Sequence, residues 1–209
     1  MERCVYLYGD SIIDNKAYVG DDECSVVEHL QNQSDYNFVH FACDGDTTQD
    51  LINKKSNFLG FKKPTDIVLS IGGNDMLYNL SFLTTDKATF RNESFSDVYK
   101  EIFEPLEVRY ETIVKNFASQ RANLLLCTVY EGDLGRSEEF KHVLDSSKIM
   151  VSSLNDIIYK TASRHNAEVL ELRNIFTSSE DYANPIEPSH KGGEKLAKKI
   201  IEWIKVNES

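Results

Sequence analysis

Five short runs of apolar and β-branched residues are spaced along the chain. Two of them, "DIVLSI" and "NLLLCTVY", are almost continuously apolar. Such runs are typical of strands that are buried on both faces of a parallel sheet. The predicted strands are Arg3–Tyr8, Asn37–Ala42, Asp66–Ile71, Asn123–Tyr130 and Ala167–Leu172.

Amphipathic helical patterns lie between these runs. The pattern over residues 96–117 places Val98, Ile102 and Leu106 on one face, at helical spacing. Strands that alternate with helices indicate an α/β fold with a parallel sheet and right-handed crossovers. The predicted helices are Asp21–Gln31, Ser96–Phe117, Glu138–His165 and Lys191–Lys205.

Polar segments marked by glycine follow four of the five predicted strands. They are Gly9–Ser11, Asp44–Thr47, Gly72–Asp75 and, after a loop, Pro185–Gly193. In parallel α/β sheets, binding sites form beyond the carboxyl ends of the strands. These four segments are therefore expected to meet at one edge of the sheet.

Composition narrows the class of protein. The length of 209 residues predicts a single domain over residues 1–209. A formal charge of −11 disfavours nucleic acid as a partner. We expect no stable membrane insertion and no secretory signal, because no apolar run approaches ~20 residues and the chain opens "MERCVYLY".

The cysteines favour a reducing compartment. Cys4, Cys24, Cys43 and Cys127 lie far apart and form no CxxC pair, so no structural zinc site is expected. Cys4 and Cys127 lie in apolar runs and are expected to be buried free thiols. The expected location is the cytoplasm.

The four polar segments, in this order, resemble the SGNH hydrolases, the superfamily that includes the bacterial GDSL lipases and esterases. The family's Ser, Gly, Asn and His are matched by Ser11 in "GDS", Gly45 in "CDGDT", Asn74 in "GGND" and His190 in "EPSH". The match spans residues 9–193. The resemblance implies a flavodoxin-like, three-layer α/β/α sandwich around a five-stranded parallel sheet.

The resemblance also implies the roles of a catalytic triad. Ser11 is the expected nucleophile and His190 the base that takes its proton. The family usually has Asp-x-x-His, whereas this chain has Glu187 three residues before His190. Glu187 is the expected orienting acid, although its side chain is one methylene longer than that of Asp. A backbone carbonyl or Asp181 are alternatives for that role.

The implied oxyanion hole consists of the backbone N–H groups of Ser11 and Gly45 and the side-chain amide of Asn74. The residues after "GGND" either line an acyl pocket or form the core face of a helix; the pocket candidates are Met76, Leu77 and Tyr78. No cofactor and no metal are expected, since the aspartates near the predicted site lack a familiar ligand spacing.

The predicted function is hydrolysis of carboxylic esters through an acyl-enzyme, with a small-molecule ester as the substrate. The acyl chain, the alcohol and the oligomeric state are left open. Two alternatives stand beside it: a non-catalytic ligand-binding protein on the same scaffold, and a flavodoxin-like regulatory or nucleotide-binding domain.

Overall fold

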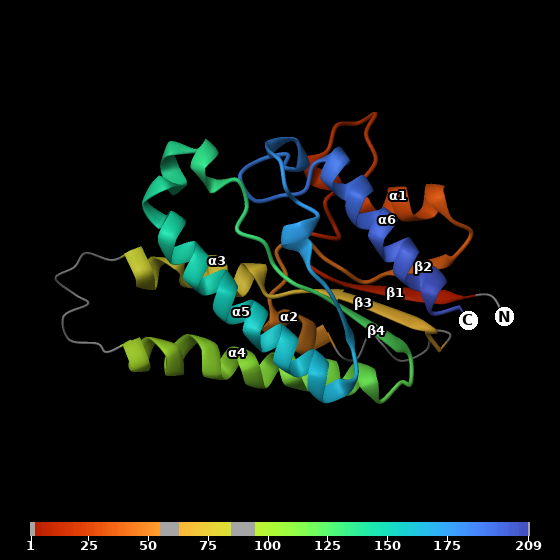
Figure 1. Ribbon diagram of the computed structural model, residues 1–209, viewed down its shortest axis with the longest axis horizontal. Helices are drawn as coiled ribbons and strands as arrows, with labels where there is room; N and C mark the ends of the chain where they lie inside the picture. Colours follow the sequence, from red (N-terminus) through yellow and green to blue (C-terminus); the bar gives the residue numbers. More distant parts are fainter. Residues whose placement is uncertain (1–2, 55–62, 85–94, 209) are drawn as a thin grey trace.

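The computed structural model describes residues 3–54, 63–84 and 95–208. Its centre is a five-stranded, all-parallel sheet with the strand order β2-β1-β3-β4-β5. This is the strand order of flavodoxin-like folds. Helices lie on both faces of the sheet, which confirms the predicted three-layer α/β/α architecture (Figure 1).

All five predicted strands are present. Every residue of β1 and β3 is buried, and neighbouring side chains on β1 enter different cores. Tyr6 and Tyr8 pack on one side of the sheet, Val5 and Leu7 on the other. The continuous apolar pattern therefore reflects burial on both faces. The strands are β1 (Cys4–Gly9), β2 (Asn37–His40), β3 (Asp66–Ser70), β4 (Asn123–Cys127) and β5 (Glu168–Leu170).

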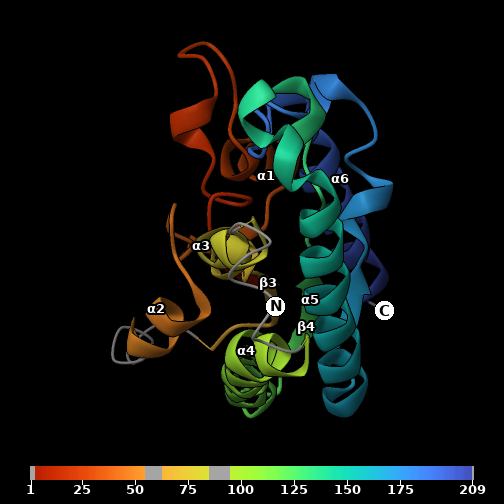
Figure 2. The same ribbon diagram turned by 90° about the vertical axis from the view of Figure 1, so that its left-hand side faces the viewer.

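The helices divide unequally between the two faces (Figures 1 and 2). One face carries α1 (Val26–Gln33) and α6 (His190–Val206), which pack against each other. The other face carries α2 (Thr48–Asn53), α3 (Gly73–Thr84), α4 (Phe95–Ala118) and α5 (Leu144–His165). Short 3₁₀ turns complete the described chain: η1 (Lys16–Tyr18), η4 (Leu134–Arg136), η5 (Glu138–Val143), η6 (Leu172–Asn174) and η7 (Ser179–Asp181).

Several helices depart from the predicted ranges. The first helix begins at Val26 because the Ser25 side chain accepts the N–H of Glu28, whose carboxylate accepts the N–H of Ser25 in return. The predicted helix over residues 138–165 is a 3₁₀ turn up to Val143 and α-helical beyond it. Helix α2 was not predicted, because six residues are too few to show a helical period.

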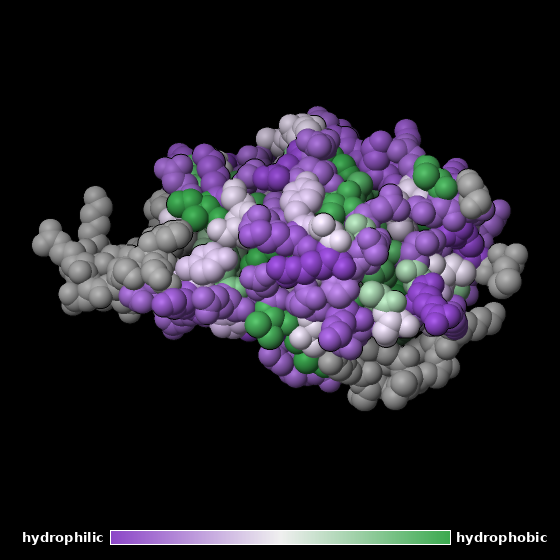
Figure 3. Space-filling model, turned by 60° about the horizontal axis from the view of Figure 1, so that its bottom comes forward, coloured by the Kyte–Doolittle hydropathy of each residue, from purple (hydrophilic) through white to green (hydrophobic). Residues whose placement is uncertain are grey.

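The face of the molecule shown in Figure 3 is mostly polar. On the face shown in Figure 3, hydrophilic residues predominate and apolar ones form small separate patches. Within the described residues, no helix combines the length and apolarity needed to cross a membrane.

Candidate active site

A tight turn at the end of β1 presents Ser11. Gly9 has φ +150°, and a Cβ there would lie 2.0 Å from the backbone oxygen of Ser70, so only glycine lets the two strand ends approach this closely. The Asp10 N–H then donates to the Ser70 carbonyl at 3.1 Å, and the Asp10 carboxylate accepts the N–H of Ile12 at 3.1 Å. No partner for the Ser11 N–H occurs among the described residues, so this donor is available to a ligand.

Two of the three predicted oxyanion donors border one cavity. Ser11 and Asn74 both line it, and Asn74 is the second residue of α3. The Asn74 amide donates one hydrogen to the carbonyl of Asp46 at 3.0 Å and keeps a second hydrogen. Gly45 adopts φ +83° in the exposed loop after β2 and does not line the cavity.

The cavity has a volume of about 70 Å³ and a mostly apolar wall. Of the predicted acyl-pocket residues, Met76 and Leu77 line it. Tyr78 does not, which corrects that prediction: its side chain is 69% exposed, because the next position along α3 turns away from the core. The other apolar lining residues are Ile12, Val129, Tyr130, Leu134, Met150, Val151 and Ile186.

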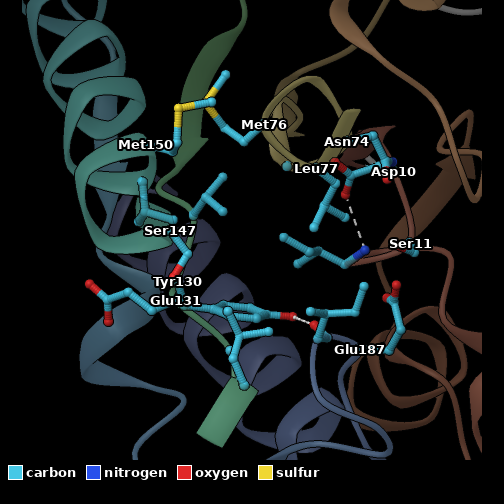
Figure 4. Close-up of a pocket in the computed structure, with 17 residues that line it drawn as sticks. Asp10, Ser11, Asn74, Met76, Leu77, Tyr130, Glu131, Ser147, Met150 and Glu187 are labelled. Atoms are coloured by element: carbon cyan, nitrogen blue, oxygen red, sulfur yellow. Dashed lines mark hydrogen bonds between the residues drawn. The ribbon is translucent and has the colours of Figure 1, made fainter. Parts of the chain in front are cut away.

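Glu187 lies in the cavity wall, and its side chain points toward Ser11 (Figure 4). The residue is only 7% exposed, and its Oε2 has no hydrogen-bond partner among the described residues. Burial, with a smaller contribution from the charge of Asp44, raises the pKa of Glu187 to about 7, while the nearby Ser11 hydroxyl acts in the opposite direction. Ser11 thus has an adjacent carboxylate in a poorly hydrated place.

Several hydrogen bonds hold the loop that carries Glu187. The Asn184 side-chain oxygen accepts the N–H groups of Ile186 and Glu187, both at 2.9 Å. The amide of Asn15 donates to the Pro188 carbonyl at 3.1 Å and ties the loop to the turn that follows Ser11. Glu187 is therefore placed beside Ser11 by a fixed backbone.

His190 lies elsewhere. As the first residue of α6, it turns its Nδ1 toward α1, 3.0 Å from the backbone nitrogen and 3.2 Å from the backbone oxygen of Cys24. The His29 Nε2 is 3.2 Å from the same Nδ1, and the two rings lie 4.6 Å apart. No described contact joins His190 to Ser11 or Glu187, and His190 does not line the cavity.

The predicted triad is therefore not assembled as expected. Glu187 reaches Ser11 instead of His190, and the Nδ1 of His190 is engaged by the backbone of Cys24. Of the two alternatives for orienting His190, the backbone carbonyl is the one in contact. Asp181 instead pairs with Lys195 at 2.7 Å.

Sequence reasoning missed residues that shape the site from a distance. Asn155 is 2% exposed, and its side chain exchanges two 2.8 Å hydrogen bonds with the backbone of Val129 at the cavity wall. The sequence does carry a signal for Asn155, because a polar residue between Leu154 and Ile157 stands out on an otherwise apolar helix face. No sequence signal pointed to Asn15, whose role depends on a residue 173 positions away.

Comparison with known proteins places this fold and turn in a family. The model of the GDSL-like lipase/acylhydrolase family matches residues 7–194, a span that includes Ser11, Asn74 and Glu187. The chain belongs to the GDSL-like lipase/acylhydrolase family. No curated protein sequence matches it.

Solved structures share the fold of this GDSL-like chain. A lipase/acylhydrolase from Enterococcus faecalis has a TM-score of 0.65 at 20% identity, over 98% of this chain and 96% of its own. The psychrotrophic esterase EstA from Pseudoalteromonas sp. has a TM-score of 0.64 at 18% identity, over 98% of this chain and 100% of its own. The acetyl xylan esterase AlAXEase has a TM-score of 0.64 at 19% identity, over 96% and 99%. At these identities the likeness shows the fold.

Asp10 is expected to make this GDSL-like protein less stable as the pH rises from 7 to 9. Burial raises the pKa of Asp10 from 3.8 to about 8, so the folded state binds a proton that the unfolded state has lost. Stability therefore falls as the pH rises through 8, by about 1 kcal/mol between pH 7 and 9, or about 2–4 °C in Tm. Thermal melts of Asp10→Asn should lack this part of the decline; an equal decline in both proteins would contradict it.

Proposed function

We propose that the chain hydrolyses carboxylic esters, with Ser11 as the nucleophile. The observation that carries the proposal is the position of the Ser11 side chain. It borders an apolar cavity at the carboxyl end of β1, beside a buried carboxylate and an amide donor. A serine hydroxyl attacks an ester only when a base takes its proton and when donors stabilise the developing oxyanion. Membership in the lipase/acylhydrolase family supports this reaction class.

The reaction follows from the groups around Ser11. Its Oγ attacks the ester carbonyl carbon, and the carbonyl oxygen gains negative charge. The free N–H of Ser11 and the second amide hydrogen of Asn74 are the donors in reach of such an oxygen. Loss of the alcohol leaves an acyl group on Ser11, and water then releases the acid.

The charges around the cavity favour uncharged substrates. Glu131 and Glu187 line it, and the exposed Asp44 lies close enough to act on the Glu187 pKa. No Lys or Arg is among the residues that line it. An anionic acyl group would meet carboxylates without a compensating cation, so a neutral acyl ester is the substrate class we expect.

Covalent labelling tests the nucleophile directly. Incubation with an alkyl fluorophosphonate should add one phosphonyl group to the intact protein, and peptide mass spectrometry should locate it on Ser11. Prior incubation with an aryl ester should slow the labelling. Absence of label on Ser11 in folded protein would exclude the proposed mechanism.

Acyl chain length should have an optimum set by the cavity. At 10–15 Å³ for each water-sized group, about 70 Å³ holds roughly five to seven such groups. Each methylene that becomes buried contributes ~0.8 kcal/mol, or about fourfold in kcat/KM. On p-nitrophenyl esters, kcat/KM should rise from acetate to butyrate and stop rising by octanoate.

A cavity-filling variant provides the control for chain length. Leu77 projects into the middle of the cavity (Figure 4), so Leu77→Trp should move the optimum toward acetate. If Leu77→Trp leaves a preference for long acyl chains unchanged, the acyl group binds outside the cavity and the prediction is wrong.

A further inference from the structure

We propose that Glu187, and not His190, is the general base that takes the proton of Ser11. This assignment rests on the proposed function and names a residue that the sequence pattern assigned to another role. Three observations support it: a carboxylate that points toward the nucleophile in the same cavity, an unused carboxylate oxygen, and the engagement of the histidine elsewhere.

Contact is the first requirement for a base. The Glu187 carboxylate points toward the Ser11 side chain, and both residues line the same cavity (Figure 4). The Glu187 Oε2 is buried and has no partner in the described part of the chain. A buried polar atom without a partner is costly, and functional sites are a common reason for keeping one.

The other titratable groups of the cavity are less suitable. Asp10 uses one carboxylate oxygen for the N–H of Ile12, and its pKa of about 8 keeps it largely protonated at pH 7. The Tyr130 hydroxyl donates to the Ile186 carbonyl at 2.8 Å. Glu131 lies on the opposite side of the cavity from Ser11 (Figure 4).

His190 has no path to the proton in this structure. Its Nδ1 is held at the Cys24 backbone, its ring packs on His29, and it is outside the cavity wall. Reaching Ser11 would require breaking the contacts between the start of α6 and α1.

The surroundings of Glu187 suit a base that works near neutral pH. The ionisable groups that act on it or feel its charge are Asp10, Asp44, Tyr18 and Tyr130, all acidic or phenolic. No cation neutralises its carboxylate among the described residues. Burial among these groups holds the pKa of Glu187 near 7, where a carboxylate is a far stronger proton acceptor than at its usual value.

Each proton in the reaction has a defined donor and acceptor. As the Ser11 Oγ bonds to the acyl carbon, its proton moves to the Glu187 carboxylate. The protonated Glu187 donates it to the leaving alcohol oxygen when the ester C–O bond breaks. In the second half, water gives a proton to Glu187 as it attacks the acyl carbon, and Glu187 returns it to the Ser11 Oγ as that oxygen leaves.

The experiment compares pH profiles of kcat/KM on p-nitrophenyl butyrate for matched variants. For the wild type, kcat/KM should rise about tenfold from pH 6 to pH 8, as expected for a base with a pKa near 7. Glu187→Gln keeps the size and hydrogen-bonding shape of the side chain but cannot accept the proton as a carboxylate does. In Glu187→Gln, kcat/KM at pH 8 should be at least about 100-fold below that of the wild type, and kcat/KM should no longer rise with pH.

Two further variants control for the loss of a negative charge and test His190 as the alternative base. Glu194→Gln makes the same chemical change on the exposed side of α6, so it controls for the lost charge. His190→Gln should keep the rise with pH and its midpoint, whatever it does to stability. Thermal melts and phosphonate labelling of Ser11 in each variant report whether the fold and the nucleophile are intact.

Temperature distinguishes the two chemical classes of base. A carboxyl group ionises with almost no enthalpy change, whereas an imidazolium loses its proton endothermically. The midpoint of the wild-type profile should therefore stay constant on warming. A midpoint that falls with temperature, or a pH limb that survives in Glu187→Gln and disappears in His190→Gln, would overturn the assignment.

Failure of the proposed function gives a different result. If Ser11 does not carry the reaction, Ser11→Ala turns the ester over as fast as the wild type, and the proposed function and the assignment of its base are both rejected. Turnover that needs Ser11 but not Glu187 rejects only the assignment of the base.

Discussion

Ser11→Ala is expected to reduce kcat for aryl esters by a factor on the order of 10⁴ or more. The hydroxyl is the only group of Ser11 that the substitution removes, and without it no acyl-enzyme forms. The Ser11 N–H stays in place, so any residual rate measures the oxyanion donors and substrate binding alone. Stability should change little, because backbone hydrogen bonds of Asp10 hold the turn and the substitution leaves them in place.

The matched control is a second serine of the same cavity. Ser147 lines it from α5, and its hydroxyl already donates to the Leu144 carbonyl at 2.8 Å. Ser147→Ala should keep most of the activity. The measurement is the initial rate of p-nitrophenolate release, together with the pre-steady-state burst, which should be absent in Ser11→Ala. Equal rates in Ser11→Ala and the wild type would instead support a non-catalytic role for the site.

Asn74→Ala is expected to lower kcat by about 100- to 1,000-fold, the usual result of removing one oxyanion donor. The donor acts on charge that exists only in the transition state, so KM should change far less than kcat. The lost hydrogen bond to the Asp46 carbonyl adds a structural effect of about 1 kcal/mol, which urea unfolding can measure separately.

Asn79 offers a comparison on the same helix. It lies further along α3, and its amide donates to the Asp75 carbonyl at 2.7 Å. Asn79→Ala should alter stability by a similar amount with a small change in kcat. A fall in kcat that is equal in both variants would mean that Asn74 acts through the helix and not through the oxyanion.

The sequence predicted the framework because its signals are local. Alternating burial on the two faces of the sheet requires apolar residues along the middle of β1 and β3, and that requirement is visible as a continuous run in each strand. The carboxyl ends of parallel strands share one edge, so the segments with Ser11 and Asn74 could be placed together without coordinates. Short helices such as α2 have too few residues to show a helical period, so the sequence did not predict them.

What the sequence by itself determined is thus the sheet, the main helices and the position of Ser11 and Asn74 at its edge. Only the tertiary structure decided which side chain of "EPSH" faces the nucleophile. Glu187 and His190 are three residues apart, and α6 begins at the second of them, so their side chains point to different places. The hydrogen bonds of Asn184 and Asn15 turn Glu187 toward Ser11, while the backbone of Cys24 receives His190. The contacts of Asn15 with Pro188 and of Cys24 with His190 join residues more than 160 positions apart, and no local pattern encodes them.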